Sequence, residues 1–331
     1  MRLAVFPIAA VMGAAGSAWA GQLETAWIPE DPSFVVHIDV EQLRETRLGQ
    51  ILLEDEFELG ITQARGEVMS EIGVDPATEL NGVTVYAIGP DIEAATVLLH
   101  TTDKIDALIE ALGEREDELD GYGAFTKRGR TIHSWDKDGE EPVYAHVMPL
   151  DEDRLVVVSQ KLERVMSAVD VIEGEERNFA DARSPGLALK PDRDALLYAE
   201  FGALAEIPGL DPASEILQHS QAIQAQLREV GEHLRFDFLV DAGSEERAGD
   251  ISDVLTGTIA LGRLIASDDP DLAFLKDLTR GLTVKAKGTR IAASLKCKIE
   301  ALLAIIGAMD EDEEECESAV EGELEAEEET D

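Results

Sequence analysis

The stretch FVVHIDVEQL at residues 34–43 decides the fold, because ALLYAEFGAL at residues 195–204 repeats its pattern. Each stretch has a short apolar run that predicts a strand, an acidic residue near the strand end, and a Leu in a following helical turn. A helical segment is expected next in both places. These segments end in similar tripeptides, Glu71-Ile72-Gly73 and Glu229-Val230-Gly231, and Gly is favoured just past a helix C-terminus.

The two halves of the chain also end alike. Residues 154–158 predict a strand that leads into Leu162, Val165, Met166 and Val169 at helical spacing. Residues 290–295 predict another strand, followed with the same spacing by Ile299, Leu302, Leu303 and Ile306. This spacing gives each helix one apolar stripe that can pack on a sheet. Three matches in the same order indicate an internal duplication.

Between these landmarks the first half predicts a meander and the second half is more helical. The first half is expected to hold strands at 83–89 and 94–101, a helix at 103–112, and hairpins at 122–135 and 142–159. For the second half we expect a helix from Asp211-Pro212 with apolar residues Ile216, Leu217, Ile223, Leu227 and Val230, a strand at 234–240, helices at 251–265 and 269–281, and a hairpin at 282–296.

The fold class that follows is α+β, with two similar halves of mainly antiparallel sheet packed by helices. The halves are assigned to residues 21–180 and 181–309, with a soft boundary at 174–194, and one continuous sheet could serve both. Residues 310–331 carry 14 acidic and no basic residues. This acidic C-terminal tail is predicted to be disordered because it cannot bury enough apolar area.

Residues 1–20 contain the parts of a cleavable signal peptide in the correct order. Arg2 is followed by an uncharged apolar run at 3–16 and by the A-x-A site Ala18-Trp19-Ala20, so Gly21 is the expected mature N-terminus. The run is too short for a membrane span. We therefore expect a periplasmic or extracellular protein of a bacterium, without a stable membrane anchor.

The formal net charge of the chain is −42. Nucleic acid is not expected as a partner, because phosphate binding needs clusters of Lys and Arg, and anionic membrane surfaces are disfavoured for the same reason. Such an acidic chain repels itself at low salt, which suggests adaptation to saline or calcium-containing surroundings.

Two cysteines, Cys297 and Cys316, leave two alternatives open. An exported protein lives where disulfides persist, so a bridge could join the tail to the last predicted strand. The other alternative is two unpaired thiols. Neither the spacing nor the neighbouring residues indicate a zinc site.

The sequence contains no G-x-S-x-G, Walker A or H-E-x-x-H motif. His37 and Asp39 stand out because residues i and i+2 of a strand point to one face, and the repeat places Tyr198 and Glu200 at the matching positions. These four residues could form a polar cluster that binds a ligand. The alternative that we prefer is a hydrogen-bonded junction in which Asp39 caps the next helix.

No cofactor is predicted, except that calcium could bind weakly. Residues 136–141, DKDGEE, resemble the start of a calcium loop but lack its third acidic position and distant Glu, so a hairpin turn explains them better. The tail could hold cations diffusely through Asp310, Glu311, Asp312, Glu313, Glu314 and Glu315. The alternative is a solvating tail without a stoichiometric site.

The opening from Trp27-Ile28-Pro29 to Val40, together with the strand-helix ending, resembles exported bacterial proteins of unknown function with duplicated α+β halves. The resemblance covers most of the mature chain and implies no activity, ligand or site residue.

Three functional hypotheses follow. The first is an exported non-catalytic binding or scaffold protein of the bacterial envelope, with an unknown protein or small molecule as partner. The second is an enzyme with a spatially assembled site, and the third is a calcium- or cation-responsive protein that acts through its acidic tail.

Overall fold

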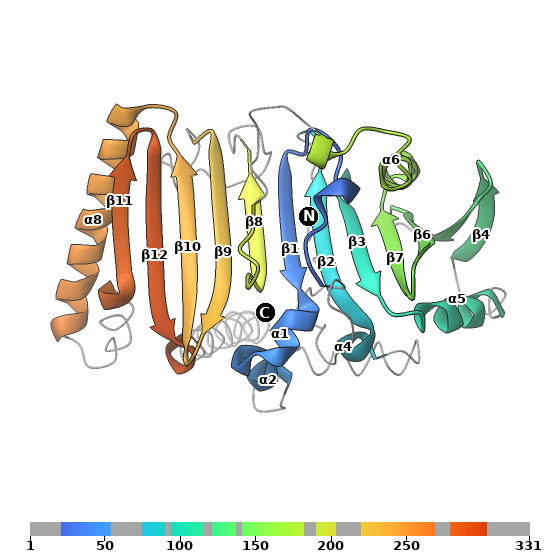
Figure 1. Ribbon diagram of the computed structural model, residues 1–331, viewed down its shortest axis with the longest axis horizontal. Coiled ribbons are helices and arrows are strands. Elements are labelled where there is room, and N and C mark those ends of the chain that lie inside the picture. The colour runs from blue at the N-terminus through green and yellow to red at the C-terminus, as the bar shows by residue number, and fades with distance from the viewer. Residues whose placement is uncertain are drawn as a thin grey trace, which may run out of the picture.

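The computed structural model describes residues 21–53, 75–89, 94–114, 121–136, 141–181, 190–202, 220–268 and 279–302. These residues form an α+β fold around a 12-stranded sheet in which every strand pair is antiparallel (Figure 1). The predicted fold class is confirmed, and the two halves share one continuous sheet. Among the described residues, no helix has the length and hydropathy needed to cross a membrane.

Within the described residues, the first half contributes seven strands and the second half five. The strands of the first half are β1 (Phe34–Asp39), β2 (Leu80–Ala87), β3 (Thr96–Thr101), β4 (Tyr122–Lys127), β5 (Arg130–Trp135), β6 (Val143–Leu150) and β7 (Asp153–Ser159). Those of the second half are β8 (Leu197–Phe201), β9 (Ala222–Val230), β10 (His233–Asp241), β11 (Leu282–Lys287) and β12 (Arg290–Lys298). The helical elements that lie in the described ranges include η2 (Thr25–Trp27), α1 (Val40–Glu45), α2 (Arg47–Leu53), α4 (Pro76–Glu79), α5 (Ile105–Glu114), α6 (Leu162–Ile172), η4 (Phe179–Asp181) and α8 (Glu245–Asp268).

The duplication is visible in the order of the strands. From the centre outward, the sheet runs β1-β2-β3-β7-β6 on one side and β8-β9-β10-β12-β11 on the other, and the β5-β4 hairpin extends only the first side. At the centre, β1 pairs with β8, and His37 lies opposite Tyr198. Because these two residues are also equivalent in the sequence repeat, a local pseudo-two-fold axis passes between them.

The sheet has two chemically different faces, since successive side chains of a strand alternate. We call the side of His37 and Tyr198 the α6 face, because α6 packs there through Val165 and Val169. Its partners in this main core are Val35, Tyr86, Leu98, Leu155, Val157 and Tyr198. On the opposite face, α8 packs at the β11 end through Ala248 and Ile251.

One predicted element is wrong. Ile223, Leu227 and Val230 belong to β9 and not to a helix, whereas residues 211–219 lie outside the described residues. The segment 223–228, IQAQLR, alternates apolar and polar residues, which suits a strand. Gly231, with φ of 65°, lies in the tight turn between β9 and β10 and does not end a helix. Its expected counterpart, Glu71-Ile72-Gly73, lies outside the described residues.

The predicted hairpins are confirmed. The β4–β5 turn lies at Arg128 and Gly129, which have φ of 49° and 80°, and the β11–β12 turn contains Gly288 with φ of 60°. Left-handed φ values of this kind favour glycine in tight hairpin turns. The predicted strand at the start of 34–43 and the predicted helices at 162–169 and 251–265 are also observed, and the helix predicted at 103–112 is observed as α5 at Ile105–Glu114.

Candidate functional site

The predicted polar cluster lies at the centre of the sheet, on the α6 face. His37 and Asp39 come from β1, Tyr198 and Glu200 come from β8, and the register places all four on the same face. All four side chains are buried. The prediction that they share one face is therefore confirmed.

His37 uses both ring nitrogens inside the protein. Nε2 lies 2.8 Å from the carbonyl oxygen of Gly21, and Nδ1 lies 2.9 Å from Oγ1 of Thr84. Because a carbonyl only accepts, Nε2 must carry the proton, and Nδ1 then accepts from the Thr84 hydroxyl. Burial lowers the pKa of His37 to about 4, against the smaller opposing effect of the Gly21 hydrogen bond. His37 is thus a neutral, fully bonded side chain.

Asp39 caps α1, as the preferred alternative predicted. Its Oδ1 accepts a hydrogen bond of 2.8 Å from the backbone N–H of Gln42, which satisfies one free donor of the helix N-terminus. Burial raises the pKa of Asp39 to about 6, although the Gln42 hydrogen bond opposes this shift.

Tyr198 and Glu200 form a second buried pair. The Tyr198 hydroxyl donates to Oε2 of Glu200 and accepts from the backbone N–H of Lys190 at 3.2 Å. Burial, followed by the bond to Glu200, raises the pKa of Tyr198 far above its ordinary value. These contacts order the strands at the centre of the sheet, which favours a structural role for the cluster.

Of the other predicted site residues, the structure describes Cys297 alone. Cys297 is buried among Leu43, Leu234 and Ile299, and burial raises the pKa of its thiol. Cys316 and the six tail residues Asp310 to Glu315 lie outside the described residues. Among the residues that are described, no group of three or more His, Cys, Asp or Glu side chains is placed to hold a metal ion.

The structure reveals a second candidate site that the sequence did not predict. The α6 face of β9–β12, which we call the basic sheet face, carries seven cations and two carboxylates. The cations are Arg228, Arg235, Lys285, Lys287, Arg290, Lys296 and Lys298, and the carboxylates are Asp237 and Asp241. All of these cations except Arg228 are exposed. A chain with a net charge of −42 thus presents one locally positive face.

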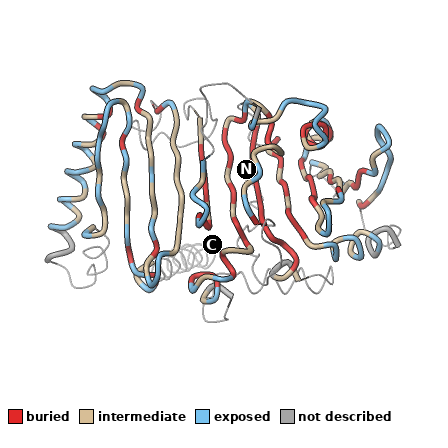
Figure 2. The backbone as a smooth tube through the Cα atoms, viewed as in Figure 1, coloured by how far each residue is buried: buried red, intermediate tan, exposed pale blue. Residues whose placement is uncertain are grey.

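Among the described residues, no helix covers the basic sheet face, because the second half departs from the duplication. In the first half, α6 follows β7 and covers this side of the sheet. The helical residues that follow β12 instead place Ile299 with Leu234 and Cys297 on the opposite face, with Leu302 packed beside them. Figure 2 shows the result: the strands β1, β2 and β3 are largely buried, whereas β9–β12 are mostly intermediate or exposed.

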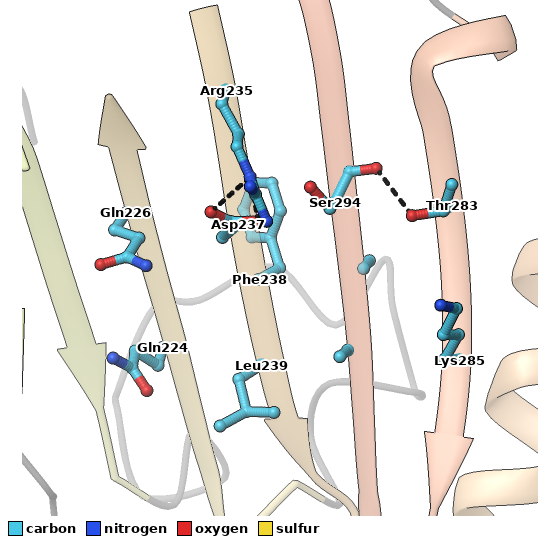
Figure 3. Close-up of a pocket in the computed structure, with 11 residues that line it drawn as sticks. Gln224, Gln226, Arg235, Asp237, Phe238, Leu239, Thr283, Lys285 and Ser294 are labelled. Carbon is cyan, nitrogen blue, oxygen red and sulfur yellow. Dashed lines mark hydrogen bonds and ion pairs between the residues drawn. The ribbon is translucent and has the colours of Figure 1, made fainter. Parts of the chain in front are cut away.

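A shallow hollow of about 360 Å³ lies in the middle of the basic sheet face (Figure 3). It is lined mainly by Gln224, Gln226, Arg235, Asp237, Lys285 and Ser294. Asp237 lies 2.8 Å from Nη2 of Arg228 and 3.0 Å from Nε of Arg235. Burial alone would raise the pKa of Asp237, but hydrogen bonds from Arg228, Ser294 and Arg235 outweigh burial and lower it.

The lysines of this face differ from the arginines in their pairing. Arg228 also pairs with Asp192 at 2.8 Å, and Arg290 lies 3.6 Å from Asp241. No carboxylate of a described residue lies within 4.0 Å of the amino groups of Lys285, Lys287 or Lys296. These ammonium groups are the available positive charges of the face.

Comparisons with known proteins give no functional assignment. No protein-family model matches the chain, and no curated protein matches it. Three crystal forms of the protein TP0453 are similar to it in structure, with 10–11% sequence identity. Their TM-scores are 0.43, 0.45 and 0.44, over 87–88% of this chain and 98–99% of those chains.

Proposed function

We propose that the protein is an exported, non-catalytic binding protein of the bacterial envelope, and that its basic sheet face binds an acidic segment of a partner protein. The excess of seven cations over two carboxylates on an open face carries the proposal. Lysines without a local carboxylate attract an anionic partner and set its orientation. The export signal at residues 1–20 supports the location.

The size of the face favours a short polypeptide segment over a larger polyanion. Four strands spaced by about 4.8 Å, each with a rise of about 3.3 Å per residue, make a patch of roughly 15–20 Å by 30 Å. An extended acidic segment fits within these limits. A nucleic acid duplex or a membrane would also meet the surrounding surface of this acidic chain and would be repelled by it.

Binding of a labelled peptide of about ten glutamates, roughly 33 Å when extended, tests the proposal by fluorescence anisotropy with the full chain. We expect saturable binding that weakens as salt rises, because salt screens exposed charges. The variant Lys285→Glu should weaken binding about tenfold. The matched control Lys127→Glu, which makes the same charge change in the β4–β5 hairpin, should change it less than about twofold.

Equal losses in the two variants would contradict the assignment of the face. A peptide of glutamines should not bind. If duplex DNA or phosphatidylglycerol vesicles bind while the glutamate peptide does not, the proposed class of partner is wrong. The Lys285→Glu variant should keep the melting temperature of the wild type, because Lys285 is exposed.

A further inference from the structure

We infer that signal-peptide cleavage creates a buried ion pair between the new α-ammonium group of Gly21 and the carboxylate of Asp39, so that processing itself stabilises the fold. The inference rests on the proposed export, and it is independent of the basic sheet face. It assigns Asp39 a second role beside the capping of α1.

Gly21 sits in a closely fitting socket at the end of β1 and β2. A Cβ atom at Gly21 would lie 2.0 Å from Oδ1 of Asp39 and 3.0 Å from the carbonyl oxygen of Asn81. On the other side, a Cβ atom at Gly82 would lie 3.0 Å from the carbonyl oxygen of Gly21. His37 holds that carbonyl through Nε2 at 2.8 Å. Residue 21 is therefore buried and held in place, and only glycine fits there without displacing its neighbours.

The socket is lined by acceptors. Oδ1 of Asp39 and the carbonyl oxygen of Asn81 both lie against Gly21. Among the described residues, the N–H of Gln42 is the hydrogen-bond donor to the Asp39 carboxylate. Asp39 forms no ion pair with a described residue, and a buried carboxylate outside an ion pair is costly. An α-ammonium group brings a positive charge and three donors, whereas a peptide N–H brings one donor and no charge.

Cleavage supplies the missing cation. Hydrolysis of the Ala20–Gly21 peptide bond by a signal peptidase consumes one water, leaves a carboxylate on Ala20 and leaves an amine on Gly21. An α-amine has a pKa of about 7.7–8.0 and is therefore mostly protonated at neutral pH. Gly21 thus meets two requirements: the cleavage motif ends directly before it at Ala20, and its lack of a Cβ lets it enter the socket without displacing Asp39.

The charged residues near Asp39 shift its pKa, but none of them takes the place of the Gly21 ammonium group in the ion pair. Glu41 and Glu45 disfavour the ionised carboxylate, and Arg44 favours it. Arg44 directs its guanidinium to the carbonyl oxygen of Leu80. The ammonium group of Gly21 is the cation that the socket itself would hold against Asp39.

A double-mutant cycle on the melting temperature tests the inference. The mature chain that starts at Gly21 is compared with the same chain acetylated at its N-terminus, each with Asp39 and with Asp39→Asn, which keeps the acceptor for the helix cap. Acetylation should lower the melting temperature of the Asp39 protein by about 5 °C, because it leaves a buried charge unpaired. In the Asp39→Asn background, only the smaller steric cost of the acetyl group should remain.

The acetylation comparison needs no substitution, so it stands even if Asp39→Asn fails to fold. A chain that retains Ala20 gives a second comparison, because its ammonium group is displaced by one residue, and it should melt at the lower temperature too. Equal melting temperatures for the free and acetylated chains would overturn the inference. So would a loss of the same size in both backgrounds.

The intact mass of the protein recovered from cells tests the processing step separately. A first residue other than Gly21 would overturn the inference at that step. An unchanged melting temperature despite a correct Gly21 terminus would overturn the ion pair alone. Neither result depends on glutamate-peptide binding, which tests the proposed function.

Discussion

Acidification from about pH 7 to about pH 4 should remove about 3 kcal/mol of the free energy of unfolding through His37 alone. The pKa of His37 is about 4 in the folded protein and has an ordinary value of 6.5. Between these values the unfolded chain binds a proton that the folded chain does not bind. The free energy of unfolding therefore falls as the pH falls through this window.

The measurement is the difference in the free energy of unfolding between the wild type and His37→Gln, taken by urea unfolding at several pH values. Glutamine can donate to Gly21 and accept from Thr84, but it does not titrate. Asp39, whose pKa is raised to about 6, contributes to the pH dependence with the opposite sign, because its folded state holds the extra proton. This contribution is common to the wild type and His37→Gln, so it drops out of the difference between them.

We expect the advantage of the wild type over His37→Gln to shrink by about 3 kcal/mol between pH 7 and pH 4. Parallel profiles for the wild type and His37→Gln would show that His37 is not held neutral in the sheet.

The substitution Asp170→Ala should cost about 2 kcal/mol of stability, because it removes the charged hydrogen bond that Asp170 accepts from the partly buried guanidinium of Arg130 and leaves Glu173 as the nearest acidic partner. Nη1 of Arg130 lies 2.5 Å from Oδ1 of Asp170, and the two side chains are only 12% and 10% exposed. The pair joins β5 to α6, and α6 covers the α6 face of the first half. The loss is measured by urea unfolding at neutral pH.

Glu175→Ala is the matched control for Asp170→Ala. Glu175 lies 3.8 Å from the same Arg130 but is 67% exposed, so its removal should cost less than about 0.5 kcal/mol. Glu173, at 2.5 Å from Nη2 of Arg130, remains in both variants. Similar losses for the two variants would refute a stabilising role for the buried pair.

The sequence predicts the elements that have strong local signals. The Arg128-Gly129 and Lys287-Gly288 turns are each flanked by strand-forming residues, so both hairpins could be predicted. β9 was missed because Ile223, Leu227 and Val230 also fit helical spacing. The alternation of apolar and polar residues in the same segment favours a strand, and the pairing of β9 with β8 and β10 shows that it is one.

The site was predictable only in part. The spacing of His37 and Asp39 places both on one face, and the cap that Asp39 provides could be predicted. The hydrogen bonding of His37 could not, because it depends on Gly21, whose position no local pattern reveals. The basic sheet face could not be predicted, since its cations come from four strands spread over residues 228–298. Only the strand register brings these cations to one side of the sheet, and a net charge of −42 gives no indication of a locally positive face.

Site-specific photo-crosslinking in the native host cells tests the central claim, that the basic sheet face holds an acidic partner segment, most directly. A photoreactive amino acid replaces Ala292 on the basic sheet face or, as the control, Thr126 in the β4–β5 hairpin; both residues are exposed. The account predicts an adduct from position 292 alone, lost with Lys285→Glu, whose crosslinked partner peptide is rich in Asp and Glu. Identical adducts from both positions, no adduct from position 292, or a partner peptide without excess acidic residues would contradict it.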